Sequence, residues 1–303
     1  MFKRILVGYA GDEAGRDALA LTARLAAALA SEITVVYPYS PLLSSVPADA
    51  AEERVREEVR AVVPHSQALA RATYHWSGSS WPIHALHSMA SYEDAELIVI
   101  GSAREGIAAH LQISLMERMV HGAPCAVLVA PAGYSERDAG ELRHIGVGFT
   151  DSTEGKAAVH LGHELAGAFA GELTVFTASW LSTVIRSYAG MAVPVSQLDA
   201  EEYAAKKTNL ERAVAELNPG TPVHAQAIKG EPSDVLVAQS STLDLLVLGS
   251  RAYGPLRHVL LGSVSAPVMR EAHCPVLVVA RGSEPGEGEP DDGERVSMSA
   301  IAD

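Results

Sequence analysis

The sequence of 303 residues is poor in cysteine, in aromatic side chains and in positive charge. Its two cysteines, Cys125 and Cys274, belong to no CxxC motif. Zinc-finger and thioredoxin-like chemistry therefore have little support, and we expect two buried, reduced thiols. Aromatic residues make up 5% of the chain, so its cores must be built from Leu, Val, Ile and Ala. That composition favours α/β layers over an aromatic-rich β-sandwich.

Acidic residues outnumber basic ones by 37 to 23, and the formal net charge is −14. This balance argues against nucleic-acid binding, which needs a basic surface. Residues 282–303 form a Gly-, Glu- and Pro-rich acidic tail that we expect to be disordered, because it cannot bury enough apolar surface to fold. No apolar run approaches the length of a membrane span, and residues 1–10 lack the apolar core of a signal peptide. We therefore expect a cytoplasmic protein without membrane association.

What the sequence does contain is an internal repeat of long period. Residues 2–39 reappear as residues 142–179, with Gly8 aligned to Gly148. Further along, AELIVIGSAREG matches LDLLVLGSRAYG, and PCAVLVA matches HCPVLVVA. This self-similarity indicates two homologous domains rather than a solenoid. We place them at residues 1–134 and 142–281, call them copy one and copy two, and expect a linker within residues 131–143.

Each copy alternates short apolar strands with helices in the same order. We expect amphipathic helices at residues 50–62 and 199–217, and further helices that begin near Pro82 and Pro232, because proline suits the first helical turn. The pattern predicts an α/β fold of two doubly wound, Rossmann-like domains, each with a five-stranded parallel sheet covered by helices on both faces. Ligands of such sheets bind beyond the carboxyl ends of the strands. In copy two, the carboxyl ends of the strands would bring together residues 148–152, 176–178 and 249–254.

The fourth strand of copy two is followed by a spaced glycine pattern: Gly249, two residues, Ala252, nine residues, then Gly262-Ser263. With this pattern and the repeat, the sequence resembles a tandem-domain universal stress protein over residues 2–131 and 142–280. Nucleotide-binding members of that family carry G-x2-G-x9-G-[ST] here, so Ala252 replaces one glycine. The resemblance implies two domains like those of adenine nucleotide alpha hydrolases, packed as an internal pseudo-dimer through their last strands.

The glycine pattern also has a physical reason. Gly249 would let the backbone approach a ligand without a Cβ in the way. Gly262 and Ser263 would open a helix whose N–H groups and dipole attract phosphate. By resemblance the ligand is ATP or a related adenine nucleotide, which can bring Mg²⁺ with it. The residues that we expect around it are Thr150 and Asp151 near the ribose or base, Leu248 along the pocket, and Gly249, Arg251, Ala252, Gly262, Ser263, Val264 and Ser265 near the phosphates.

Copy one departs from this pattern. Ile113 takes the place of Gly262, and the loop is one residue shorter. Because a branched side chain there would fill the space for phosphate, we expect copy one to have lost nucleotide binding. Copy two departs as well, since Thr150 stands where the family tends to place Asp. A nucleotide-free interaction module with both pockets degenerate therefore remains an alternative.

Other motifs give little support for catalysis or metal binding. Lys156 follows two glycines at the wrong spacing for a P-loop. The pairs His84/His87 and His160/His163 have no third ligand at a fixed spacing, and no G-x-S-x-G elbow occurs. We expect no catalytic residues and no metal site. The prediction is a stress-response regulator that binds ATP and acts on an unknown protein partner. An enzyme of the nucleotide-alpha-hydrolase kind is a weaker alternative. A homodimer of two chains is plausible, but composition does not show it.

Overall fold

A computed structural model of the chain describes residues 1–38, 46–77, 82–102, 116–137, 140–180, 195–250, 259 and 261–279. In copy one the elements are β1 (Arg4–Gly8), α1 (Glu13–Leu29), β2 (Glu32–Pro38), α2 (Ala48–Val62), α3 (Gln67–Ala70), β3 (Thr73–Ser77), α4 (Pro82–Tyr92), β4 (Leu97–Gly101) and β5 (Ala126–Ala130). In copy two they are β6 (His144–Gly148), α6 (Thr153–Ala168), β7 (Glu172–Ser179), α8 (Val195–Ala215), β8 (Val223–Lys229), α9 (Pro232–Ser240), β9 (Leu245–Gly249), α10 (Ser265–Glu271) and β10 (Val276–Val279). A 3-10 helix, η1 (Tyr134–Glu136), lies between the copies. The tail, residues 282–303, is outside the described residues.

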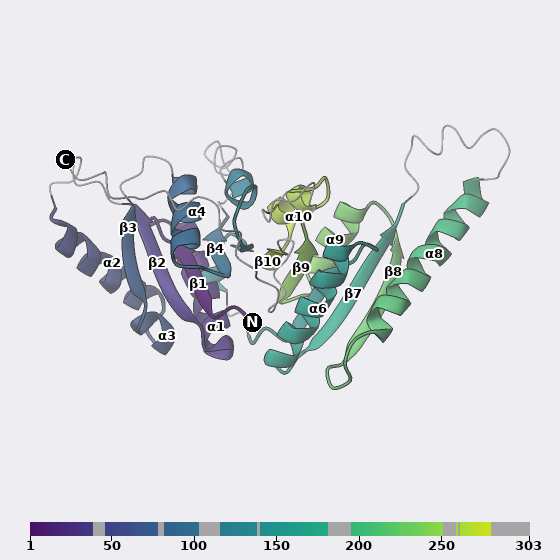
Figure 1. Ribbon diagram of the computed structural model, residues 1–303, viewed down its shortest axis with the longest axis horizontal. Coiled ribbons are helices and arrows are strands. Elements are labelled where there is room, and N and C mark those ends of the chain that lie inside the picture. The colour runs from purple at the N-terminus through teal and green to yellow at the C-terminus, as the bar shows by residue number, and fades with distance from the viewer. Residues whose placement is uncertain are drawn as a thin grey trace, which may run out of the picture.

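The strands of both copies form one continuous ten-stranded sheet in the order β3-β2-β1-β4-β5-β10-β9-β6-β7-β8 (Figure 1). Within each copy all neighbouring strands are parallel, whereas β5 and β10 pair antiparallel, with Leu128 opposite Leu277. The prediction of two five-stranded parallel halves in a pseudo-dimer is thus confirmed. The pairing also covers the apolar edges that the last strands would otherwise expose.

Helices cover the sheet on two faces, and each face has its own hydrophobic core. One core runs from α1 and α2 across to α6 and α8, and includes Leu128 and Leu277. The other lies under α4, α9 and α10 and includes Val127 and Val276. Successive residues of a strand alternate between the cores, as the two-residue period of a strand requires. Each core therefore continues across the β5–β10 junction, and burial of one leucine there contributes about 2 kcal/mol.

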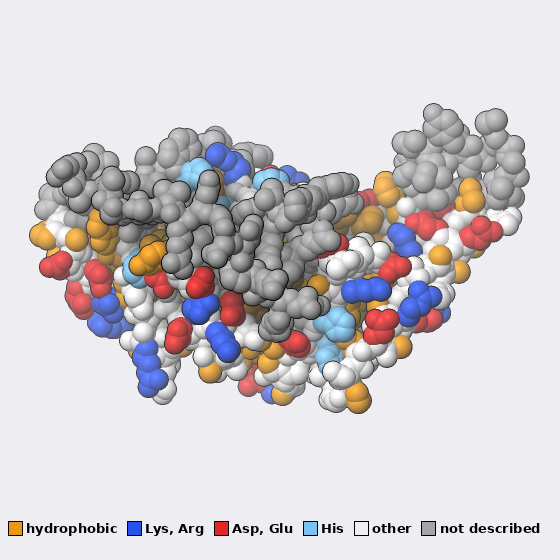
Figure 2. All heavy atoms as spheres, in the orientation of Figure 1, with side chains coloured by type: hydrophobic (Ala, Val, Ile, Leu, Met, Phe, Trp, Pro, Cys, Tyr) orange, Lys and Arg blue, Asp and Glu red, His pale blue; other side chains and the backbone are white. Residues whose placement is uncertain are grey.

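Local sequence explains where several helices begin. α4 and α9 start at Pro82 and Pro232, as expected. The Glu231 carboxylate caps α9 by accepting from the backbone N–H groups of Ser233 and Asp234. The charged helices are longer at their amino ends than expected: α2 begins two residues earlier, and α8 runs from Val195 to Ala215 instead of over 199–217. On the face that Figure 2 shows, acidic and basic side chains are interspersed, and ion pairs one helical turn apart occur on both α2 and α8.

The linker predicted within residues 131–143 is packed, in its first part, against copy one. Tyr134 is buried, and the guanidinium carbon of Arg24 lies 5.0 Å from the centre of its ring. The buried carboxylate of Asp17, on α1, accepts from the backbone N–H of Gly133 at 2.7 Å and from the backbone N–H and hydroxyl of Ser135 at 2.7 and 2.6 Å. Composition alone did not predict this packing.

Candidate ligand site

A cavity of about 640 Å³ lies at the carboxyl ends of the strands of copy two. Its walls come from the ends of β6, β7 and β9 and from the adjoining parts of α6, α8, α9 and α10. The volume is within the range of small-molecule sites, about 300–1,000 Å³. Seven of the predicted site residues line it: Thr150, Asp151, Leu248, Gly249, Gly262, Val264 and Ser265. Ser263 is exposed and is not among the lining residues, and Arg251 and Ala252 lie outside the described residues.

The turn before α10 differs in detail from the expectation that Gly262 and Ser263 open the helix. α10 begins at Ser265, and Val264 is its N-cap residue, without a side-chain capping bond. The backbone N–H of Ala266 nevertheless donates to the carbonyl of Gly262 at 3.3 Å, which is the spacing of a helical hydrogen bond. Gly262 thus stands at the entry to the helical turn and lines the cavity.

Gly249 has a structural reason that the sequence did not reveal. A Cβ atom at this position would lie 2.7 Å from the backbone oxygen of Glu154, in the first turn of α6. Copy one has the same close approach, since a Cβ at Gly101 would lie 1.9 Å from the backbone oxygen of Ala14. Because both copies share it, packing of a helix against the strand end explains this glycine. A ligand is not needed to account for it.

The loop from β6 to α6 holds Thr150 and Asp151 at the mouth of the cavity. The Ser152 hydroxyl caps α6 by accepting from the Gly155 N–H at 3.0 Å. A Cβ at Gly155 would lie 2.0 Å from the backbone oxygen of Thr150. The chain therefore folds back tightly here, and only glycine fits at position 155.

Ser250 is a lining residue that the sequence analysis did not single out. It is 2% exposed, and its Oγ atom is buried without a hydrogen-bond partner. A buried hydroxyl without a partner costs about 1–3 kcal/mol, so such a group points to a water molecule or a ligand. The sequence signal was weak, because a serine after a strand is common.

Lys206, on α8, is a second lining residue that was missed. Its ammonium donates to the backbone carbonyl of Ala178, at the end of β7, over 2.7 Å, and lies 3.1 Å from Glu202 Oε1. In the sequence, Glu202 and Lys206 have the spacing of an ordinary surface ion pair on a helix. The tertiary position of α8 is what brings the lysine to the cavity.

Copy one presents different groups at the corresponding edge. Tyr9, which the repeat aligns with Phe149, is buried, and its hydroxyl donates to Glu58 Oε2 at 2.9 Å. Burial and this carboxylate raise the pKa of Tyr9 well above its usual value. Glu58 Oε2 also lies 3.8 Å from where a Cβ on Gly11, the counterpart of Asp151, would stand. A carboxylate thus occupies this edge. Ile113 lies outside the described residues, so the argument from that residue stays a prediction.

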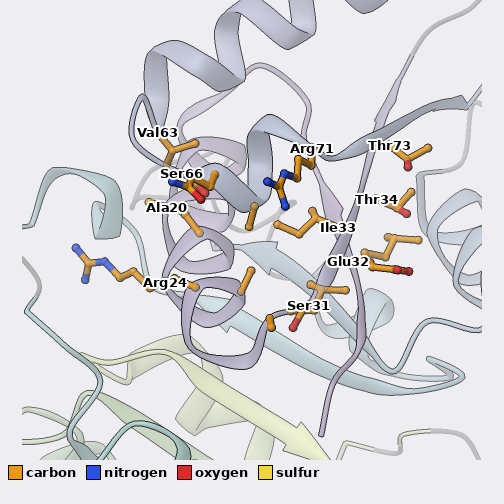
Figure 3. Close-up of a pocket in the computed structure, with 18 of the residues that line it drawn as sticks. Ala20, Arg24, Ser31, Glu32, Ile33, Thr34, Val63, Ser66, Arg71 and Thr73 are labelled. Carbon is orange, nitrogen blue, oxygen red and sulfur yellow. The ribbon is translucent and has the colours of Figure 1, made fainter.

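A larger hollow, about 1250 Å³, lies at the opposite edge of copy one, near the amino ends of the strands (Figure 3). Two of its arginines already donate to protein groups. Arg24 donates to the Tyr134 hydroxyl at 3.2 Å and extends away from Arg71, and Arg4 Nε donates to the backbone oxygen of Asp94 at 2.8 Å. We therefore place the candidate site in copy two, although its cavity is smaller.

The cysteines and the histidine pairs do not form a metal site among the described residues, although His163 Nε2 is buried without a hydrogen-bond partner. Both cysteines are free thiols, Cys274 buried and Cys125 partly exposed, and burial raises the pKa of each to about 12. His87 Nε2 lies 2.7 Å from the backbone oxygen of Met119. Among the described residues, no three His, Cys, Asp or Glu side chains group together as metal ligands would. In the same part of the chain, no helix combines the length and apolar character of a membrane span.

Comparison with known proteins gives the same family for both copies. Residues 1–131 and 141–280 match the universal stress protein family. A universal stress protein of Mycobacterium tuberculosis strain H37Rv is 25% identical over 297 residues, which cover 91% of this chain and 99% of the relative. One of Methanocaldococcus jannaschii is 39% identical over 64 residues, 20% of this chain, and the match spans 38% of that relative's length.

The fold has a full-length counterpart among solved structures. A universal stress protein from Archaeoglobus fulgidus superposes with a TM-score of 0.60 and 18% identity, covering 92% of this chain and 97% of the other. At that identity the likeness speaks for the fold alone. The family match extends over nearly all of both repeats. The chain therefore belongs to the universal stress protein family, as a member with two domains in tandem.

Proposed function

We propose that the cavity of copy two binds an adenine nucleotide, ATP in the first place, and that the chain is a cytoplasmic stress-response regulator rather than an enzyme. The observation that carries the proposal is the gathering of seven predicted residues around one cavity of about 640 Å³ at the carboxyl edge. The partnerless hydroxyl of Ser250 in the same wall supports it. Phosphates would lie against the Gly262–Ser265 turn, and the ribose or base near Thr150 and Asp151.

The regulatory part of the proposal follows from the arrangement of the two copies. Val259, three residues before Gly262, contacts copy one: it accepts from the backbone N–H of Gly122 at 2.8 Å and donates to the carbonyl of Ala123 at 3.1 Å. A nucleotide that stabilises one arrangement of the Gly262–Ser265 turn would favour one arrangement of both copies, which a protein partner would read. ATP turnover would be slow and incidental.

The first experiment asks whether nucleotide is present and stabilising. Freshly purified full-length protein is heat-denatured, and the released small molecules are separated by chromatography. ATP with Mg²⁺ is then added to ligand-free protein, and unfolding is followed. Nucleotide at a hundred times its Kd should stabilise the fold by about 2.7 kcal/mol. Absence of both released nucleotide and stabilisation would favour the nucleotide-free interaction module.

A variant pair locates the site. Gly262→Val should abolish the stabilisation by ATP, because its side chain would enter the space next to the turn. Gly140→Val is the control, since a Cβ at Gly140 meets nothing within 4 Å. Turnover of ATP that Gly262→Val abolishes would instead indicate an enzyme.

A further inference from the structure

The face of α8 that borders the cavity presents two polar side chains that no part of the glycine pattern contains. Lys206 and Asn209 both line the cavity. They are three residues apart, so they lie on the same side of the helix. Leu210, next to Asn209, is 1% exposed and anchors α8 in the core. The two side chains are therefore held on a fixed element.

The contacts of Lys206 leave part of its hydrogen-bonding capacity for a ligand. An ammonium group carries three N–H donors. One is used by the Ala178 carbonyl at 2.7 Å, and a second by Glu202 Oε1 at 3.1 Å. The nearby carboxylate balances the charge, which favours a neutral acceptor as third partner over another phosphate. Asn209 adds an amide: its Oδ1 already accepts from Arg212 Nη1 at 3.4 Å, which leaves a second lone pair of that oxygen and the NH₂ donors for a ligand.

The sheet places these residues far from the phosphate turn. β7, which ends beside Lys206, is separated from β9 by β6. Neighbouring strands lie about 4.8 Å apart, so the end of β7 is roughly 10 Å from the end of β9, where the glycine pattern begins. A nucleotide with its phosphates at the Gly262 turn would bring its base, not a phosphate, toward α8.

We propose that Lys206 and Asn209 select the base of the nucleotide. Lys206 donates to a ring nitrogen or carbonyl on the base, and Asn209 pairs with a neighbouring donor and acceptor, as amide side chains pair with adenine. The cavity therefore takes a nucleotide and discriminates it from a phosphate chain that lacks a base. This inference rests on the proposed function of the same cavity.

Calorimetric titrations of full-length protein with ATP and with inorganic tripolyphosphate test the proposal. Lys206→Ala should weaken ATP binding about tenfold, as expected for a lost charged hydrogen bond, and Asn209→Ala severalfold. Neither change should alter the weaker binding of tripolyphosphate. Lys207→Ala is the matched control, because Lys207 is its exposed neighbour and pairs with Glu211 at 3.8 Å. If Lys206→Ala does not fold, Lys206→Met removes the charge and keeps the apolar stem.

Each other outcome has a distinct meaning. Unchanged ATP affinity in Lys206→Ala overturns the proposal, and so does an equal loss for ATP and tripolyphosphate, which would place Lys206 at the phosphates. Wild-type protein that binds tripolyphosphate as tightly as ATP also overturns base selection. Wild-type protein that binds neither compound refutes the proposed function itself, whereas in the other cases nucleotide binding survives and the role of α8 fails.

Discussion

The two copies have the same strand order and the same helix-to-strand packing, yet their carboxyl edges differ chemically. In copy one, Tyr9 is buried and hydrogen-bonded to Glu58. In copy two, Phe149 takes the place of Tyr9, and Lys206 lines the cavity there. Features that both copies share are explained by the fold. Features that differ are the ones on which an argument for a ligand can rest.

The comparison of the copies gives different explanations for two glycines of the pattern, Gly249 and Gly262. Gly249 has a counterpart in Gly101, and both approach the first turn of a helix closely. Gly262 has no glycine counterpart, since the repeat aligns it with Ile113. Gly262 therefore keeps its meaning as a candidate phosphate-binding residue, whereas Gly249 does not need a ligand.

The largest expected effect is on the shared glycines. Gly101→Ala and Gly249→Ala should each destabilise the protein without any ligand, by about 3 kcal/mol or more, because the new methyl group would overlap a backbone carbonyl. Gly101→Ala should cost more, as its contact is the shorter, 1.9 Å against 2.7 Å. Urea unfolding measures both. If Gly249→Ala leaves stability intact but abolishes ATP binding, the ligand explanation of this glycine returns.

The second prediction concerns Asp17 of copy one, because its counterpart in copy two has no side-chain acceptor. Asp17 holds the chain after β5 through three hydrogen bonds, whereas the repeat places Ala157 at its position. Asp17→Ala should lower the free energy of unfolding by about 2–3 kcal/mol, since it removes three hydrogen bonds to a buried carboxylate and leaves partly buried N–H groups unpaired. Ser135→Ala removes one of the three bonds and should cost about 1 kcal/mol. If both variants lowered the free energy of unfolding equally, the hydrogen bonds from the backbone N–H groups to Asp17 would contribute nothing to stability.

Much of the fold could be predicted because it depends on local patterns. Apolar strands such as Leu245–Gly249 alternate with helices twice, and the repeat fixes which elements correspond. The parallel halves and the junction of β5 with β10 follow from that order and from the family resemblance. Helix starts at Pro82 and Pro232 follow from the geometry of proline.

The site could be predicted in part. Residues on the strand ends and on the turn before α10 were found, because both follow directly from the glycine pattern. Lys206 and Asn209 were not, since only tertiary packing of α8 brings them to the cavity. Asp17 was missed for the same reason: its partners lie more than a hundred residues away, in a segment whose composition resembles a linker.

The third prediction uses the two cysteines, which the repeat places in equivalent positions. Burial raises both pKa values to about 12 from the usual 9.0, so the protonated thiol stabilises the fold below pH 9. That contribution should be lost as pH rises from 9 toward 12, where the unfolded chain has already released its protons. Cys125 is partly exposed and Cys274 is 3% exposed. Iodoacetamide should therefore modify Cys125 about tenfold faster. Equal rates would indicate reaction through global unfolding.

The smallest expected effects are at the capping residues of α1 and α6. Asp12 and Ser152 occupy equivalent positions, and each accepts from the N–H of a glycine, Gly15 at 2.8 Å and Gly155 at 3.0 Å. Asp12→Ala and Ser152→Ala should each cost about 1 kcal/mol of stability. Denaturant unfolding without nucleotide measures the stability that each variant loses. A loss in only one of the two variants would show that the two caps are not equivalent.

ATP affinity should respond differently to changes at the two capping residues, because Ser152 lines the cavity of copy two. Ser152→Asp gives copy two the cap of copy one, so stability should be kept, since Asp caps a helix as well as Ser. The added carboxylate would face an anionic ligand and should weaken ATP binding about threefold to tenfold, an effect that high salt reduces. The reverse change, Asp12→Ser, should leave both quantities unchanged, because Glu58 still occupies the edge of copy one. Weaker ATP binding in Asp12→Ser would place a nucleotide in copy one, and the contrast between the two edges would then be wrong.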